Sequence, residues 1–232
     1  MSLRCGQKLA HNQAFERDAA KRGAPQLHVG RKSQLKGKCK MSRKIVVTEY
    51  ISLDGVVQDP VGMEGSGLGD WTGPFTRGPE GDKFKHEELF ASDALIFGRV
   101  TYDGFAAVWP TVKDGAGFAD RMNSLPKYVA SNTLKSASWS NTTVWAGDLV
   151  AEVRGLKETQ GGEILIYGSA SVVHELMPHR LIDEYRLMVY PTVLGRGKRL
   201  FPDDVKSMMT LAECKQFGGG IVLLRYHPDA TP

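Results

Sequence analysis

One pattern recurs along most of this sequence: a short apolar run ends in small or hydroxyl residues, and a helical segment follows it. Apolar runs with the length and β-branched content of strands occupy residues 45–51, 94–97, 128–131, 143–145 and 163–167. Segments with helical spacing occupy residues 82–91, 100–108, 115–124, 149–158 and 171–177. Strands that alternate with helices predict a mostly parallel sheet with helices on both faces.

The last third of the sequence changes this pattern. Residues 182–190 read as a long strand, and residues 209–217 and 221–227 flank the turn Gly218-Gly219-Gly220. Two strands around a glycine turn predict a hairpin, which would form an antiparallel edge of the sheet. The predicted fold class is therefore α/β, with a central sheet of about eight strands.

The first forty residues differ from the rest in charge and composition. They hold ten Lys/Arg and two acidic residues, a net charge of +8, so the other 192 residues carry 20 basic and 24 acidic side chains, or −4. Such a segment lacks the apolar surface needed to offset the entropy of ordering. We expect residues 1–40 to be a basic, disordered extension and residues 41–232 to be one domain. An extension without a role, a targeting or nucleic-acid-binding segment, and a folded appendage are the alternatives.

Other classes of protein are disfavoured by composition. No apolar stretch approaches the roughly 18 residues of a membrane span, and the N-terminus lacks the apolar region of a secretory signal. The three cysteines, Cys5, Cys39 and Cys214, form no C-x-x-C pair, and the histidines show no metal-ligand spacing. We expect a cytosolic protein with no metal, and binding to nucleic acid only through the tail.

Two strand ends carry residues suited to phosphate. Gly98-Arg99-Val100-Thr101 and Gly168-Ser169-Ala170-Ser171 each join a predicted strand to a predicted helix. Backbone N–H groups at a helix N-terminus attract phosphate, glycine allows close approach, and arginine can form a bidentate contact. The alternatives are a glycine turn with a surface arginine at the first cluster and ordinary N-capping by serine at the second.

A third strand end resembles the first two. Ser131, Asn132 and Thr133 lie at the end of the run 128–131 and just beyond it, although turn chemistry alone accounts for such residues. In open α/β sheets ligands bind at the carboxyl ends of the strands. Because three strand ends finish in Gly, Ser or Thr, we expect one ligand site across them.

Candidates for the substrate side lie after the first strand. Ser52-Leu53-Asp54-Gly55 opens a connection that extends to residue 81 with eight glycines, and a connection of that length is usually functional. Asp54 would border the substrate, and Trp71 and Phe75 could cover a planar ring; a common Asp-Gly turn is the alternative. Tyr102 and Trp109 lie seven residues apart, a spacing that also fits a core stripe of a helix.

These clusters occur in a familiar order. It comprises Ser-Leu-Asp-Gly at 52–55, Gly-Arg-x-Thr-Tyr at 98–102 with Trp109, Ser-Asn-Thr-Leu at 131–134, Gly-Ser at 168–169, Leu-Ile-Asp-Glu at 181–184 and Pro-x-x-Leu-Gly-x-Gly at 191–197. Over about 43–227 the sequence resembles the family of the riboflavin-biosynthesis reductase C-terminal domain, within the dihydrofolate-reductase-like superfamily.

The resemblance implies an eight-stranded sheet, often dimeric, that binds NADPH across strand carboxyl ends. It implies that Gly98, Arg99 and Thr101 bind cofactor phosphates, with Arg99 near the 2′-phosphate. Hydride transfer would occur near the end of the first strand. The residues expected to complete the cofactor site are Val47, Ser131, Asn132, Thr133, Gly168, Ser169, Ala170 and Ser171, and those expected to contact substrate are Ser52, Trp71 and Trp109.

The resemblance also implies an acidic residue at the start of the first helix, which helps to protonate the substrate. Counting back from Gly98-Arg99 gives Asp82, and a buried carboxyl with a raised pKa would suit this role; a helix N-cap after Gly81 is the alternative. Asp82 and Asp54 are therefore the candidate catalytic residues.

Two departures from the family leave the substrate open. The zinc-binding deaminase signatures are absent, and Tyr-Asp-Gly-Phe follows Thr101. We expect an NADPH-dependent reductase of a small heterocyclic, pterin- or pyrimidine-like substrate, acting as a homodimer. The alternative is a non-catalytic nucleotide-binding sensor or scaffold.

Overall fold

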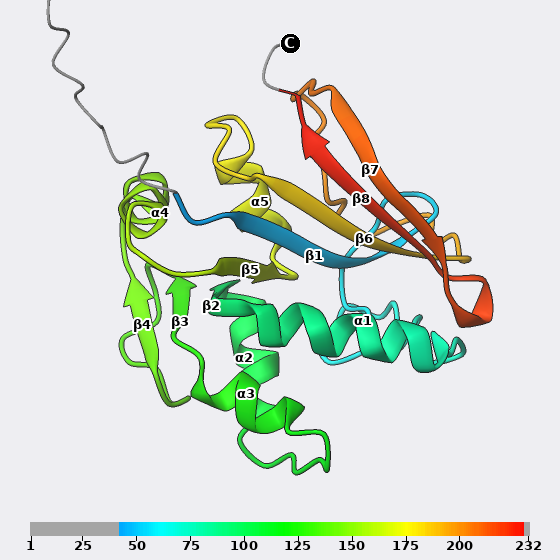
Figure 1. The fold of residues 1–232 in the computed structure, drawn as a ribbon, viewed down its shortest axis with the longest axis horizontal. Helices are drawn as coiled ribbons and strands as arrows, with labels where there is room; N and C mark the ends of the chain where they lie inside the picture. Colours follow the sequence, from blue (N-terminus) through cyan, green and yellow to red (C-terminus); the bar gives the residue numbers. More distant parts are fainter. Residues whose placement is uncertain (1–41, 230–232) are drawn as a thin grey trace, which may run out of the picture. The chain divides into compact units, whose positions relative to one another are not determined.

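The computed structural model describes residues 42–229, so the predictions for residues 1–40 lie outside the described residues. Figure 1 shows a central sheet with helices on either side. The strands are β1 (Ile45–Ser52), β2 (Ser92–Gly98), β3 (Lys127–Ala130), β4 (Thr142–Trp145), β5 (Glu163–Tyr167), β6 (Glu184–Tyr190), β7 (Met209–Gln216) and β8 (Val222–Pro228). The α-helices are α1 (Gly78–Ala91), α2 (Arg99–Val108), α3 (Phe118–Ser124), α4 (Leu149–Lys157) and α5 (Ala170–Leu176).

The sheet has eight strands in the order β4-β3-β2-β5-β1-β6-β8-β7. The pairs from β4 to β6 are parallel, whereas β8 pairs antiparallel with both β6 and β7. The predicted mostly parallel sheet with an antiparallel C-terminal hairpin is confirmed. Because β3, β2, β5 and β1 are neighbours, the strand ends singled out in the sequence lie along one edge.

Strand β1 separates two apolar layers. Ile45, Val47 and Ile51 pack in a cluster with α4 and α5, and Val46, on the opposite face, packs in a cluster with α1, α2 and α3. Successive strand residues point to opposite faces, so one strand supplies both cores. All four of these side chains are almost fully buried.

Strand β1 extends beyond the end of its neighbour β5. It pairs with β5 only as far as Thr48, which lies opposite Tyr167, but it pairs with β6 as far as Ser52, opposite Tyr190. Beyond Tyr167 the chain turns at Gly168, which has a φ of +56°. Among the strands that the structure describes, none pairs with residues 49–52 of β1 on the β5 side.

Two predicted helix starts are corrected. Helix α1 begins at Gly78 rather than at Asp82, because Pro79 occupies its first turn and suits that position. Helix α3 begins at Phe118 rather than at residue 115, because the Asp114 carboxylate accepts hydrogen bonds from the N–H groups of Ala116, Phe118 and Ala119 and shapes a turn there.

No helix within residues 42–229 is long and apolar enough to cross a membrane.

Candidate functional site at the strand carboxyl ends

The two glycine turns predicted to hold phosphate are in direct contact. The Gly98 N–H donates to Ser169 Oγ at 2.7 Å, and Ser169 Oγ donates to Thr101 Oγ1 at 3.0 Å. Gly98 ends β2 and Gly168 follows β5, which is the neighbour of β2. The structure thus joins residues about 70 positions apart into one cluster at the carboxyl edge.

Close packing favours glycine at both turns, and more strongly at Gly168. A Cβ on Gly98 would lie 3.3 Å from Ser169 Oγ, and a Cβ on Gly168 would lie 2.9 Å from Thr101 Oγ1. Ser169 itself has a φ of +71°, a left-handed conformation that costs energy for a residue with a side chain. Backbone held in such a conformation is typical of functional sites.

The first turn of α2 has unused hydrogen-bond donors. Its N-cap is Gly98, and no side chain caps the helix, so the first backbone N–H groups lack the partner that a serine or aspartate would supply. Arg99, the first residue of α2, has a side chain that is 40% exposed and pairs through Nε with Asp103 at 2.6 Å. An exposed guanidinium beside free helix N–H groups is an arrangement suited to an anion.

The third predicted cluster lies one strand further along the same edge, at the end of β3. Ser131 Oγ accepts hydrogen bonds from the N–H groups of Thr133 and Leu134, at 3.2 and 3.0 Å. Asn132 Oδ1 accepts from the N–H of Gly147 at 2.9 Å. These bonds are the turn chemistry that was the alternative interpretation, and they fix the shape of this edge.

Asp54 and Ser52 hold the turn after β1. Ser52 Oγ donates to Asp54 at 2.6 Å, and the carboxylate also accepts from the N–H groups of Leu194 and Gly195, at 3.1 and 2.8 Å. These hydrogen bonds, that from Ser52 first, lower the pKa of Asp54 to about 2. An ionised carboxylate with these partners joins two loops and has no proton to give at neutral pH.

Asp82 lies at the surface. Its side chain is 64% exposed and pairs with Arg77 Nε at 2.6 Å, and it falls in the second turn of α1 because the helix begins at Gly78. Neither the buried carboxyl nor the N-cap expected at this position is present.

The aromatic candidates are engaged in packing. Trp71 is only 6% exposed, its Nε1 donates to the Gln58 carbonyl at 2.9 Å, and its ring meets Tyr190 edge-on. Trp109 packs against Phe105 and Phe118 in the cluster beneath α2 and α3, as the core-stripe interpretation predicts. Val47 is fully buried in the middle of β1. Trp71 is therefore a packed side chain that can form a wall of a site, and is not itself an open lid.

Two buried charged residues near the outer half of β1 were missed in the sequence. Lys85, on the sheet-facing side of α1, donates to Thr48 Oγ1 at 2.8 Å and to Glu88, and its Nζ lies 4.8 Å from the centre of the Tyr167 ring. Glu49 is 5% exposed. The sequence did contain a sign of Glu49, because a glutamate stands inside the apolar run 45–51. An ionisable side chain is costly to bury, so one in a buried strand is a candidate functional residue.

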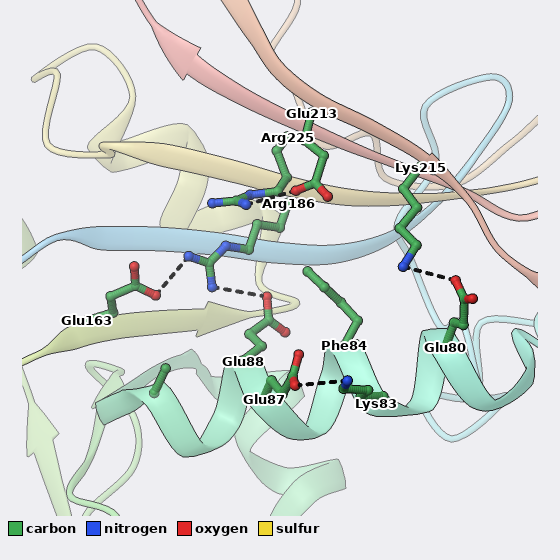
Figure 2. Close-up of a pocket in the computed structure, with 11 residues that line it drawn as sticks. Glu80, Lys83, Phe84, Glu87, Glu88, Glu163, Arg186, Glu213, Lys215 and Arg225 are labelled. Atoms are coloured by element: carbon green, nitrogen blue, oxygen red, sulfur yellow. Dashed lines mark hydrogen bonds and ion pairs between the residues drawn. The ribbon is translucent and has the colours of Figure 1, made fainter.

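An open pocket of about 520 Å³ lies elsewhere, between α1 and the strands β6, β8 and β7 (Figure 2). None of the predicted site residues lines it. Its basic side chains are paired with acids at distances between 2.7 and 3.7 Å: Lys83 with Glu87, Lys215 with Glu80, Arg225 with Glu213 and Glu184, and Arg186 with Glu163, Glu184 and Glu88. Pairing of this kind leaves little charge for a ligand.

Comparison with known proteins identifies relatives over nearly the whole described region. The family model of the RibD C-terminal domain matches residues 43–223. The uncharacterized protein YyaP of Bacillus subtilis (strain 168) is 29% identical over 191 residues, which cover 80% of this chain and 95% of YyaP.

Solved structures share the fold. A Shewanella sp. PV-4 protein assigned to riboflavin biosynthesis superposes with a TM-score of 0.61 at 19% identity, covering 80% of this chain and 99% of that one. The diaminohydroxyphosphoribosylaminopyrimidine deaminase/5-amino-6-(5-phosphoribosylamino)uracil reductase of Thermotoga maritima gives a TM-score of 0.55 at 15% identity, over 81% of this chain and 57% of that one. The fold class predicted from the sequence is confirmed by these structures, and the family match shows that this chain belongs to the RibD C-terminal domain family.

Proposed function

We propose that residues 41–232 form an NADPH-dependent reductase that transfers a hydride to a small heterocyclic, pterin- or pyrimidine-like substrate. One observation carries the proposal: the contact of the Gly98 and Gly168 turns through Ser169 and Thr101. It forms a tight, glycine-dependent cradle at adjacent strand ends, which is where open α/β sheets bind dinucleotides.

The residues at this edge fit a dinucleotide with a 2′-phosphate. The uncapped first turn of α2, with Gly98, Arg99 and Thr101, would hold cofactor phosphate, and Arg99 would lie near the 2′-phosphate. The pyrophosphate would lie against the backbone of Gly168, Ser169, Ala170 and Ser171. Ser131, Asn132 and Thr133 would flank the adenosine end, one strand further along. Bound NADPH would supply the hydride.

The substrate would lie over the outer half of β1, near Ser52, with Trp71 as a packed wall of the site and Trp109 supporting α2. The reductase named in the Thermotoga comparison acts on a pyrimidine, which supports a heterocycle of this class. We also propose that the protein is a homodimer, as the family resemblance implies, and cytosolic, as expected from its cysteine content. Light scattering that gives twice the mass of one chain would check the dimer.

Titration of the full chain with NADPH and NADH, followed by nucleotide fluorescence, tests cofactor binding. Replacing Arg99 by alanine removes a charge-assisted contact worth about 1.5–3 kcal/mol, so NADPH affinity should fall about tenfold or more and NADH affinity should not change. Arg154→Ala, which removes an exposed arginine from α4, is the matched control. A wild-type protein that binds neither nucleotide contradicts the proposal.

Turnover is tested separately. NADPH oxidation would be followed with a panel of dihydropterins, aminopyrimidines and quinones. Oxidation with a ring substrate supports the reductase, whereas tight NADPH binding without oxidation across the panel would favour the alternative of a non-catalytic nucleotide sensor.

A further inference from the structure

Glu49 occupies a distinctive place in the sheet. It is the first residue of β1 beyond the last pair with β5, Thr48 opposite Tyr167, yet it still pairs with Leu187 of β6. The parallel register therefore places Glu49 level with the Gly168 turn, the same turn that contacts Gly98 and Thr101. A carboxyl-bearing residue thus adjoins the proposed cofactor cradle at the point where the sheet opens.

The carboxyl group of Glu49 has no hydrogen-bond partner at one oxygen. Oε1 is buried and makes no hydrogen bond among the described residues. Glu49 alternates with Thr48, so its side chain points away from α1, to the face that also holds Val47 and Leu187. Buried polar atoms without partners are rare because each one costs free energy, so this oxygen, at the point where the sheet opens, points to a bound molecule that completes it.

The surroundings of Glu49 favour its neutral, protonated form. Burial raises the pKa of the Glu49 carboxyl well above its usual range, Lys85 of α1 acts in the opposite direction, and Glu64 raises it further. Glu64 belongs to the loop before α1, where its N–H donates to Asp59 Oδ1 at 2.8 Å. A carboxylic acid that keeps its proton at neutral pH can act as a general acid.

We propose that Glu49 is the proton donor of the reduction, an inference that rests on the proposed function. Addition of a hydride to the carbon of a ring C=N bond places an electron pair on the nitrogen. The Glu49 O–H bond breaks and its proton forms the new N–H bond, which yields the reduced ring, oxidised nucleotide and the Glu49 carboxylate. The positive charge of Lys85, on the α1 face of the strand, favours that carboxylate electrostatically until a solvent proton restores the acid.

Infrared spectroscopy of the full chain tests where the proton is held, without any turnover. The difference spectrum between wild type and Glu49→Gln should contain the C=O stretch of one protonated carboxyl at neutral pH. This band should shift when saturating NADP⁺ binds. Loss of the band at neutral pH, or a band that does not move although fluorescence shows NADP⁺ bound, overturns the proposal. Glu158→Gln, an exposed residue after the last turn of α4, should give no such band.

Kinetics test the role in proton transfer, with the panel compound that oxidises NADPH fastest. Glu49→Gln should lower kcat by about 100-fold or more, with the KM for NADPH changed by less than about threefold. Glu49→Asp keeps a carboxylic acid but shortens the side chain by one methylene group. Its kcat should lie between those of wild type and Glu49→Gln. A Glu49→Gln protein with wild-type kcat overturns the proposal while leaving the reductase intact, whereas a wild type that binds no NADPH overturns both.

Discussion

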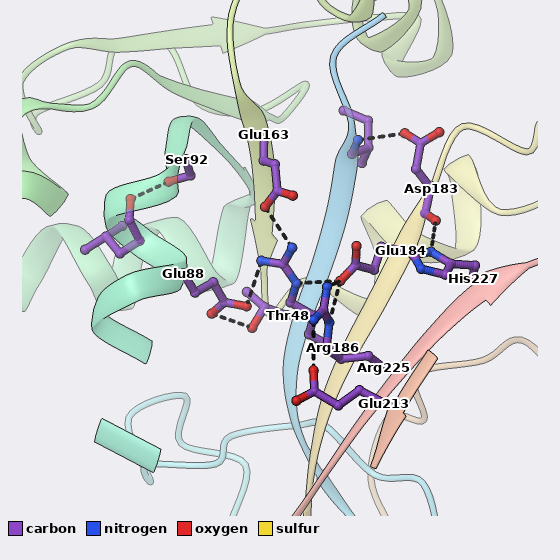
Figure 3. A network of polar contacts seen from close by, with 12 residues as sticks. Thr48, Glu88, Ser92, Glu163, Asp183, Glu184, Arg186, Glu213, Arg225 and His227 are labelled. Atoms are coloured by element: carbon purple, nitrogen blue, oxygen red, sulfur yellow. Dashed lines mark hydrogen bonds and ion pairs between the residues drawn. The ribbon is translucent and has the colours of Figure 1, made fainter. Parts of the chain in front are cut away.

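Two groups of buried polar side chains flank the central strand, and they differ in how fully they are paired. On the α1 face, Arg186 bonds to Glu184 and Glu163 at 2.7 and 2.8 Å and lies 3.5 Å from Glu88, and Glu184 also accepts from Arg225 (Figure 3). At the outer end of β1, a buried oxygen of Glu49 has no hydrogen-bond partner within residues 42–229.

The difference separates residues that stabilise the fold from residues available to a ligand. Burial works against the charge of Arg186, but the hydrogen bond from Arg186 to Glu184 and the nearby carboxylates outweigh it and raise the pKa of Arg186. Glu88 Oε1 makes no hydrogen bond among the described residues, but it faces the Arg186 guanidinium at 3.5 Å. A network in which opposite charges face one another can tolerate burial, whereas a buried polar group without such a partner is retained only at a cost. The pocket of Figure 2 borders this paired network, and this is a further reason why we propose the strand carboxyl ends as the functional site.

The largest expected effect tests the paired group. Arg186→Met removes the guanidinium that pairs with Glu184 and Glu88, leaving buried carboxylates with fewer counterions, and should lower the free energy of unfolding by about 3–5 kcal/mol. Urea unfolding at neutral pH measures this loss. Arg99→Met, in an exposed ion pair, should cost under about 1 kcal/mol. Equal losses of unfolding free energy in Arg186→Met and Arg99→Met would contradict a stabilising role for the buried, paired group.

The second effect tests the unpaired group through pH. Because the pKa of Glu49 is raised in the folded protein, its contribution to stability is fully present below the unfolded pKa of about 4.3 and is lost as pH rises toward the folded pKa. Wild type should therefore lose up to about 1.4 kcal/mol per pH unit relative to Glu49→Gln over this window.

Urea unfolding of both proteins at about pH 4.5, 6 and 7.5 measures this difference, in which other titrating groups cancel. Glu158→Gln should follow wild type at each pH. A stability gap between wild type and Glu49→Gln that stays constant with pH would show that Glu49 is already ionised in the folded protein.

A third, smaller effect tests the glycine cradle. Gly168 and Gly195 both have positive φ, +56° and +72°, so alanine at either position should cost about 1–2 kcal/mol for the backbone alone. Only at Gly168 would the new Cβ meet another residue, Thr101 Oγ1 at 2.9 Å. Gly168→Ala should therefore lose at least about 1 kcal/mol more than Gly195→Ala in chemical denaturation. Similar losses would mean that the turn yields to a methyl group.

The smallest effect concerns Asp103, which pairs with Arg99 at the surface. Asp103→Asn should change the free energy of unfolding by less than about 1 kcal/mol, because both side chains are exposed. NADPH affinity should rise, since the guanidinium is no longer partly neutralised. Fluorescence titration beside wild type measures this change, and a loss of affinity would place Asp103 itself among the binding residues.

The strands and helices, and their order along the chain, could be predicted from local sequence patterns. Apolar residues recur with a different spacing in buried strands than in amphipathic helices. Gly98 and Gly168 could be expected near one another, since both end strands of one parallel sheet. Their direct contact through Ser169 depends on the pairing of β2 with β5 and could not be read locally. The position of Glu49 where the sheet opens likewise depends on where β5 ends.

Other site predictions failed or changed for identifiable reasons. The start of α1 moved because Gly78-Pro79 begins the helix, and this shifted Asp82 to an exposed position. Asp54 follows a strand, as expected, but its partners Leu194 and Gly195 lie 140 and 141 residues away in the sequence. Trp71 is a large aromatic in a glycine-rich loop, and only the fold reveals that Tyr190 contacts its ring.

The unequal pairing of β1 has a consequence for how the molecule moves. Residues 45–48 are held by hydrogen-bonded strands on both sides, while residues 49–52 are held on one side only. Amide hydrogens should then exchange with heavy water at two different rates within a single strand, with the boundary at Glu49. A molecule that fills the open side of residues 49–52 would remove this difference in exchange rate. Ligand binding would then make this half of the strand more rigid.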